Sequence, residues 1–287
     1  MRRQARVRGA RDGDELLLLL DSGNSRLKWT LTHSAYRRGQ VFASRGVLEL
    51  SSVQRSASAL VRVMRSAGAA VRIHACNVAG GQVERQIRTA ARRAGLSPPR
   101  FVRSTAAAAG VRNAYHEAWR LGADRWVALI GARHEYPRQA LCLVGIGSAL
   151  TIDLLDADGR HRGGSIIPGP QMMIESLLSH TAGIRRRAAL PAAALARALS
   201  AEPTTADQIL FARATRTALL SGARHACAAL IERAAAQGRV QIGRRPRLII
   251  AGGAAAAITP LLHITHGRDD DLVLRGLAVL AQDTSAR

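Results

Sequence analysis

The chain has 287 residues, a hydrophobic fraction of 47% and a formal net charge of +22 at neutral pH. No apolar run approaches the roughly 20 residues of a membrane helix, so the composition indicates one or two soluble globular domains without a membrane span. Lys28 is the only lysine among the 42 basic residues. The arginines are scattered without interleaved aromatic residues, which disfavours specific nucleic-acid binding.

Residues 1–14 contain five arginines and little that a core would bury. They resemble the charged front of a signal peptide, but the apolar run behind them stops after five leucines and no cleavage site follows. We therefore expect a disordered basic extension and a cytoplasmic protein. Cys76, Cys142 and Cys227 lie far apart in the sequence, which predicts buried free thiols rather than a disulfide framework or a zinc site.

The first structured stretch is a predicted β-hairpin. Residues 16–20 are all leucine and predict a buried strand, which ends at Asp21 and breaks into a turn of small residues at 22–25. Residues 27–32 then alternate between apolar and polar, as in a half-exposed strand. A carboxylate at the end of a buried strand, beside free backbone N–H groups, suits a phosphate and its Mg²⁺. An ordinary turn is the alternative.

The rest of the first half predicts alternating strands and helices. Apolar spacing and turn residues predict a third strand within 39–50, a helix at 51–68, a strand at 71–78, a helix at 82–95, a short strand at 101–102 and a helix from 123.

The pattern then starts again. We expect strands at 141–144, 150–155 and 163–167, helices at 171–179 and from about 205 to 237, a strand at 248–251 and a last helix at 272–282. A strand, a tight turn and a second strand thus open each half, near residues 21 and 145. Two such units facing each other across a cleft would hold the two ends of a triphosphate, so the repeat favours nucleotide binding.

Four motifs in chain order resemble those of one family. They are Asp21-Ser22-Gly23-Asn24-Ser25 with Lys28, Gly122-Ala123-Asp124-Arg125-Trp126, Gly147-Ser148-Ala149-Leu150-Thr151-Ile152-Asp153 and Gly163-Gly164-Ser165-Ile166-Ile167-Pro168-Gly169. As a set they are similar to the type III pantothenate kinases, a family that also includes the Bvg accessory factor proteins. The resemblance covers nearly the whole chain from about residue 16.

The resemblance implies an α/β actin-like ATPase fold, with two duplicated ribonuclease-H-like domains, an interdomain cleft and a homodimer. It implies an N-terminal domain at 15–121, with the first phosphate loop. A C-terminal domain at 122–287 would carry the second phosphate loop and an adenosine loop at Gly252-Gly253. The implied activity is ATP-dependent phosphorylation of pantothenate to 4′-phosphopantothenate, the first step of coenzyme A biosynthesis.

The same resemblance assigns the nucleotide site. The first loop comprises Asp21, Ser22, Gly23, Asn24, Ser25, Arg26, Leu27 and Lys28, and the second comprises Gly147 and Ser148. Asp21 would hold Mg²⁺ through water, and Lys28 would add a positive charge to the phosphate site.

Asp124 matches the catalytic carboxylate of the family. Phosphoryl transfer needs an alcohol aligned with the γ-phosphate, and a carboxylate can orient that alcohol and accept its proton. The implied substrate residues are Tyr115, Gly122, Ala123, Asp124, Arg125 and Thr205, with His180 reaching the partner's pocket. Taken alone, Asp124 and Arg125 also suit a helix start with a neighbouring salt bridge, and Thr205 suits a helix N-cap.

The sequence departs from the family at four positions. Gly145 replaces an aspartate associated with a monovalent cation (K⁺ or NH₄⁺), Ser148 a threonine, Ala212 a glycine and Ala254 an aspartate. These departures motivate an alternative, a non-catalytic accessory or regulatory relative of the same fold. A kinase or phosphatase with another substrate is a further alternative.

His263, His266 and the three aspartates at 269–271 form one other cluster of potential metal ligands. The segment lacks a third imidazole at a suitable spacing. We expect a solvated loop between two helices here rather than a metal site.

Overall fold

The computed structural model describes residues 15–42, 44–50, 53–68, 71–189, 191, 194–195, 198–199, 201 and 209–283. The predicted extension at 1–14 and Thr205 lie outside the described residues. The chain forms two compact units, one of Met1–Pro137 with Asp271–Arg287 and one of Arg138–Asp270.

The sheet of the first unit has five strands in the order β3-β2-β1-β4-β5. Pairing is antiparallel from β1 to β2 and from β2 to β3, and parallel from β1 to β4 and from β4 to β5. The strands are β1 (Leu16–Ser22), β2 (Arg26–His33), β3 (Ser44–Glu49), β4 (Arg72–Asn77) and β5 (Arg100–Phe101). The hairpin expected from the leucine run is confirmed. The third strand lies within the expected range of 39–50, and a turn with a hydrogen bond from Gln40 N to Arg37 O (3.1 Å) precedes it.

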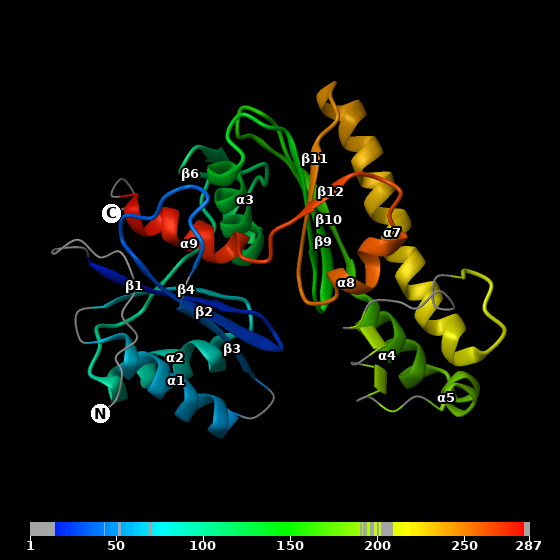
Figure 1. Ribbon diagram of the computed structural model, residues 1–287, viewed down its shortest axis with the longest axis horizontal. Coiled ribbons are helices and arrows are strands. Elements are labelled where there is room, and N and C mark those ends of the chain that lie inside the picture. The colour runs from blue at the N-terminus through cyan, green and yellow to red at the C-terminus, as the bar shows by residue number, and fades with distance from the viewer. Residues whose placement is uncertain are drawn as a thin grey trace. The chain divides into compact units, whose positions relative to one another are not determined.

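Helices cover both faces of this sheet (Figure 1). α1 (Val53–Ala67) and α2 (Gly81–Ala94) pack on the face to which Leu18 and Leu20 point, and they share one core with it. Because successive residues of a strand point to opposite faces, Leu17 and Leu19 point to the other face. That face carries α3 (Ala123–Glu135) and α9 (Leu272–Gln282), which pack on each other and on β1 and β4.

Two glycines allow α3 and α9 to approach closely. A Cβ on Gly276 of α9 would lie 1.9 Å from the carbonyl oxygen of Val127, and one on Gly131 of α3 would lie 2.1 Å from that of Leu272. The sequence analysis placed the boundary between the two domains at residue 121, whereas the first unit extends to Pro137 and also includes Asp271–Arg287. The close packing of α3 on α9 places both helices in the first unit, although 133 residues of the second unit separate them in the sequence.

The sheet of the second unit repeats the topology of the first, with the order β10-β9-β8-β11-β12. β8 pairs antiparallel with β9 and parallel with β11, as β1 does with β2 and β4. The strands are β8 (Leu141–Ile146), β9 (Ala149–Leu155), β10 (His161–Pro168), β11 (Arg247–Ala251) and β12 (His266–Arg268). The duplicated sheet predicted from the two strand–turn–strand units is therefore present.

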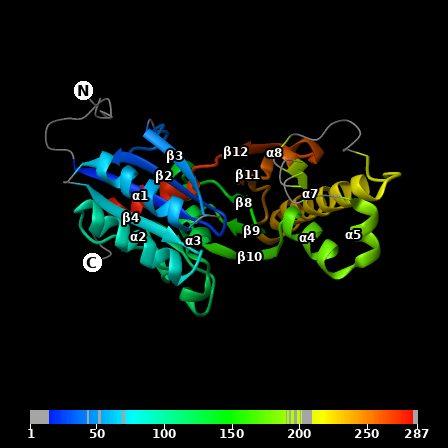
Figure 2. The same ribbon diagram turned by 90° about the horizontal axis from the view of Figure 1, so that it is seen from below.

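The helices of the second unit form two clusters (Figure 2). α7 (Thr215–Ile242) and the short α8 (Ala255–Ile258) pack on β8, β9 and β11. α4 (Pro170–His180) and α5 (Ala182–Ala188) pack against the first half of α7.

Several elements differ from those expected. α7 begins at Thr215, because residues 209–214 run alongside its first turns and Ser221 Oγ donates to the Ile209 carbonyl (2.6 Å). The helix ends at Ile242, five residues beyond the expected end at 237. Gly238 has no side chain to press against Leu154 and Pro246, so the helix continues past them. The hairpin of β6 (Ala107–Ala108) and β7 (Val111–Arg112), the 3₁₀ turn η1 (Ala118–Arg120), α5 and β12 were not expected, since elements this short show little periodicity. Among the described residues, no helix combines the length and the hydropathy needed to cross a bilayer.

Replacing Gly276 by alanine should lower the melting temperature. The added methyl group would collide with the Val127 carbonyl and separate α3 from α9, a cost of about 1–3 kcal/mol that exceeds the gain in helix propensity. Gly222→Ala is the matched control, because a Cβ at Gly222 in α7 meets no atom within 4 Å. Thermal unfolding followed by circular dichroism measures both, and equal melting temperatures for the two variants would contradict the packing argument.

Candidate active site

The turn between β1 and β2 lies at the carboxyl end of β1. Gly23 N donates to Arg26 O (3.0 Å), and Asp21 and Lys28 are directly opposite each other in the two strands. Asn24 and Ser25 are exposed, and within the described part of the chain no acceptor engages their backbone N–H groups. The turn therefore offers backbone donors and a lysine, which is suitable for a phosphate.

Asp21 lies at the carboxyl ends of two parallel strands, next to Cys76 of β4. Burial raises the pKa of the Asp21 carboxyl from its usual 3.8 to about 6. The positive charge of Lys28 opposes this rise, and the negative charge of Asp124 adds to it. The two carboxylates therefore lie close enough for each to feel the charge of the other, and a divalent cation beside Asp21 would relieve their repulsion.

Asp124 lies in the first turn of α3, where the helix dipole favours a negative charge. Its Oδ1 accepts a hydrogen bond from Arg125 N (2.8 Å), and the buried Trp126 anchors the helix start in the core. A Cβ on Gly122 would lie 2.7 Å from Asp124 Oδ1. Glycine at position 122 thus leaves space for the carboxylate in its present position.

The structure brings Tyr115 and Arg125 together. Arg125 Nη1 donates to the hydroxyl of Tyr115 (3.0 Å), and the guanidinium lies 5.7 Å from the centre of the tyrosine ring. Arg125 is buried, with 6% of its surface exposed. The structure therefore joins Arg125, the predicted substrate residue next to Asp124, with Tyr115.

Two supporting residues in this segment were not among the predicted site residues. Asn113 accepts a hydrogen bond from Tyr115 N (3.0 Å) and donates from Nδ2 to the carbonyls of Thr105 and Ala118. Ser104 Oγ donates to the Leu121 carbonyl (2.7 Å), immediately before Gly122. The only signal in the sequence is Asn113 itself, two residues before Tyr115 and able to form an Asx turn.

The second predicted phosphate loop, Gly147-Ser148, is the two-residue turn between β8 and β9. Gly169, just before α4, packs directly on it, since Gly169 N donates to Ser148 O (2.8 Å) and a Cβ there would lie 2.1 Å from Gly147 O. Gly252 approaches from β11 with a φ of +113°, and a Cβ there would lie 2.3 Å from the Ile146 carbonyl oxygen. Glycines thus bring three backbone segments together at the carboxyl end of β8.

Asp270, after β12, holds the Gly252 segment. Asp270 accepts hydrogen bonds from Gly252 N (2.9 Å) and from Arg268 Nε (2.8 Å). Asp271 belongs to the first unit and pairs with Arg45 (2.8 Å). Within the described residues no group of three histidine, cysteine or acidic side chains is arranged to hold a metal ion. The segment was expected to be a loop, but His266 lies in the strand β12.

Two other predicted positions have few neighbours that bear on the site, and Thr205 lies outside the described residues. His180 is the exposed last residue of α4. Gly145 lies in β8, where a Cβ would be 2.9 Å from Thr151 Oγ1.

The raised pKa of Asp21 predicts that Asp21→Asn stabilises the metal-free protein at neutral pH. Well below pH 3.8 the carboxyl is protonated in both the folded and the unfolded state, whereas above pH 6 folding keeps a charged carboxylate in a poorly hydrated position. Wild type should therefore lose stability as the pH rises from about 3.8 to about 6, the interval between the unfolded and the folded pKa, and should lose no more above it. The variant should exceed wild type by an amount on the order of 2–3 kcal/mol at pH 8, and by less than about 1 kcal/mol at pH 4.

Urea unfolding at pH 4 to 8 with a chelator present measures this difference. Asp158→Asn, which removes an exposed turn carboxylate, is the control and should show no such pH dependence. If the free energies of unfolding of Asp21→Asn and wild type differed by the same amount at every pH in this range, the raised pKa of Asp21 would be contradicted.

Solved structures with low sequence identity share the fold. MreB5 of Spiroplasma citri bound to ADP aligns over 93% of this chain and 96% of its own, with a TM-score of 0.52 and 10% identity. Component A of the (R)-2-hydroxyglutaryl-CoA dehydratase from Acidaminococcus fermentans aligns over 95% and 99%, with a TM-score of 0.51 and 11% identity. Together with the duplicated sheet, these similarities show the actin-like ATPase fold.

Relatives with higher sequence identity identify the family. Proteins named type III pantothenate kinase are 34% identical in Nitrosococcus oceani (94% of this chain, 95% of the relative), 37% in Aromatoleum aromaticum (94% and 100%) and 38% in Burkholderia thailandensis (92% and 97%). The family model of type III pantothenate kinase matches residues 17–237. The motifs at 21–28, 122–126, 147–153 and 163–169 all lie within that match, and this chain therefore belongs to the type III pantothenate kinase family.

Proposed function

We propose that this chain transfers the γ-phosphate of ATP to pantothenate and yields ADP and 4′-phosphopantothenate, the first step of coenzyme A biosynthesis. Family membership supports the reaction. The observation that carries the assignment of residues is the buried Asp21 carboxyl, paired in register with Lys28 beside a turn with free backbone donors.

In the proposed step, Asp124 orients the primary hydroxyl of pantothenate and accepts its proton. The hydroxyl oxygen forms a bond to the γ-phosphorus, the bond from that phosphorus to the bridging oxygen of ATP breaks, and ADP leaves with the electron pair. Asp124 lies in the first turn of α3, where the helix dipole favours a negative charge. The Gly122 backbone fixes where the carboxylate lies, since no Cβ fills that space.

The residues present fit the Mg²⁺ that accompanies ATP in kinases. Asp21 is a carboxylate whose ionisation costs free energy next to Asp124, and a cation would remove that cost. When bound, the ion neutralises phosphate charge. We propose that Asp21 holds it through water, while Lys28 and the backbone N–H groups of the β1–β2 turn bind phosphate oxygens. The Gly147-Ser148 turn is proposed as the second phosphate loop, and Gly252-Gly253 as the adenosine loop.

For pantothenate, the proposed contacts are those of the Tyr115 and Arg125 cluster. The guanidinium would pair with the carboxylate of pantothenate, and its hydrogen bond to the tyrosine hydroxyl keeps it in place. Gly122 and Ala123 would contact the substrate through their backbone. Thr205 completes the proposed set.

The resemblance also implies a bound monovalent cation, but residue 145 is a glycine and has no side chain that could hold one. Gly145 supplies no carboxylate in β8, and the nearest group to its missing side chain is Thr151 Oγ1. We propose that the rate depends only weakly on K⁺ or NH₄⁺. Equal rates in KCl and NaCl support this, and loss of activity in NaCl would overturn it.

We further propose a cytoplasmic homodimer. Apolar side chains are exposed on the second unit, including Ile166 of β10 (60%) and Met172 (45%) and Leu177 (43%) of α4. Beside them lies a largely apolar groove of about 370 Å³ between α4, α5 and α7. Exposed apolar surface of this kind is typical of a subunit interface. Sedimentation equilibrium gives the mass directly, and a monomer at micromolar concentration would refute the dimer.

Asp124→Asn should lower kcat for pantothenate phosphorylation at least about a hundredfold, because the amide cannot accept the proton. Transfer from [γ-³²P]ATP to pantothenate measures the rate, and Asp158→Asn is the matched surface control. Background activity in both wild type and Asp124→Asn would instead favour a non-catalytic relative of the same fold.

A further inference from the structure

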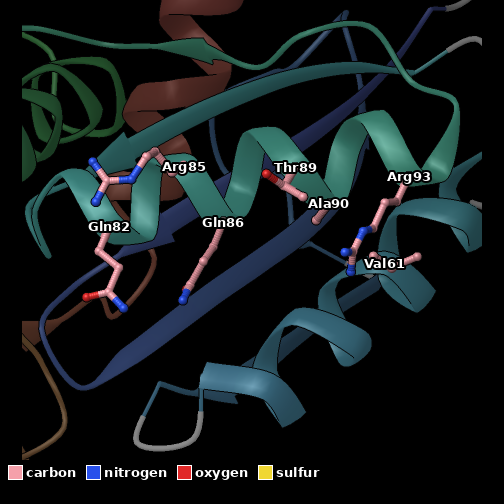
Figure 3. A pocket seen from close by; sticks show the side chains of 7 residues that line it. All are labelled: Val61, Gln82, Arg85, Gln86, Thr89, Ala90 and Arg93. Atoms are coloured by element: carbon pink, nitrogen blue, oxygen red, sulfur yellow. The ribbon is translucent and has the colours of Figure 1, made fainter.

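A cavity of about 410 Å³ lies between α1 and α2. None of the residues proposed to bind ATP or pantothenate lines it. α1 contributes Val61, and α2 contributes the other lining residues, Gln82, Arg85, Gln86, Thr89, Ala90 and Arg93 (Figure 3). On α2 they follow at intervals of three and one residues in alternation, which places them along one side of the helix. The volume falls within the range of small-molecule sites.

The two helices around this cavity are strongly basic. Their sequences contain seven arginines and a single acidic residue, Glu84. That acid is already engaged, since it pairs with Arg88 (2.8 Å) and lies 3.7 Å from Arg103. Within the described residues, no carboxylate lies within ion-pair distance of Arg85 or Arg93. The cavity therefore holds positive charge that the described part of the protein leaves unbalanced.

The donors follow one another along α2. Arg85 and Arg93 are eight residues apart, or about 12 Å along the helix axis. Gln86 and Thr89 lie between them along the helix with an amide and a hydroxyl, and Gln82 precedes them. In Figure 3, Gln82, Gln86 and Arg93 extend from the lower edge of α2, whereas Arg85 extends from its upper edge toward the N-terminal end. At the other end Arg65 Nη2 donates to the Arg93 carbonyl (3.2 Å), so a third guanidinium is close by.

This arrangement selects the kind of ligand. Guanidinium groups bind phosphates through paired hydrogen bonds, and the neutral donors between them suit the middle of an anionic chain. No carboxylate lines the cavity to repel such a ligand, and no aromatic side chain lines it to stack a base. A nucleic-acid strand is therefore disfavoured relative to a linear chain of phosphate groups.

We propose that the α1–α2 cavity is a binding site for a linear polyphosphate anion. Arg85 and Arg93 bind its two ends, and Gln82, Gln86 and Thr89 donate hydrogen bonds along it. The site is distinct from the proposed phosphate loops and does not depend on the chain acting as a kinase.

Isothermal titration calorimetry with inorganic tripolyphosphate tests the site on the full chain at about 0.15 M salt. Arg85→Gln/Arg93→Gln should weaken binding at least tenfold. Arg62→Gln/Arg92→Gln is the matched control, since it removes two exposed arginines from the same helices that do not line the cavity. Both variants keep Lys28 and the turns at 22–25 and 147–148. Any tripolyphosphate that binds at those turns therefore binds equally in both variants and does not affect the comparison.

The expected result is near wild-type tripolyphosphate affinity in the control variant, much weaker affinity for monophosphate, and unchanged pantothenate kinase rates in both variants. An equal loss of affinity in both variants would show general charge attraction and overturn the proposal. Equal affinity for monophosphate and tripolyphosphate, or tighter binding of a single-stranded oligonucleotide that displaces tripolyphosphate, would also overturn it.

Discussion

Burial of the Asp21 carboxyl is the constraint on which the site in the first unit depends. Asp21 lies near the end of β1 in the middle of the sheet, where burial raises the pKa of the carboxyl, and the negative charge of Asp124 adds to that rise. A nearby cation opposes both effects, and Lys28 supplies part of that compensation from the opposite strand. A fold that places both acids at one end of the sheet thus creates a position suited to a metal ion with its phosphates.

The two units use one sheet topology for two different turns. In the first, the β1–β2 turn combines a carboxylate, a lysine and exposed backbone donors. In the second, the β8–β9 turn carries no charged side chain, and the segments containing Gly169 and Gly252 approach its backbone closely. The first turn therefore offers charged groups to a ligand, whereas the second offers closely packed backbone. Because the second turn does not depend on charged side chains, the absence of a carboxylate at Gly145 does not disturb it.

The regular pattern of the chain made much of the fold predictable, including the hairpin of β1 and β2. Five leucines, a turn of small residues and an alternating segment predicted the hairpin, and glycine-rich turns located Gly147-Ser148 and Gly252-Gly253. Short elements such as β12 and α5 were missed, because three to seven residues cannot establish a period. The start of α7 was misplaced because the contact of Ser221 with the Ile209 carbonyl, twelve residues away, holds residues 209–214 outside the helix.

The sequence by itself determined the strand–turn–strand repeat, the order of the motifs and hence the family, because these depend on spacing between neighbours in the chain. Only the tertiary structure decided which distant groups meet. It joined α9 to α3 through Gly131 and Gly276, placed Arg125 against Tyr115, and raised the pKa of Asp21 by burial. Such contacts depend on how completed helices and sheets pack, and spacing along the chain does not encode that packing directly.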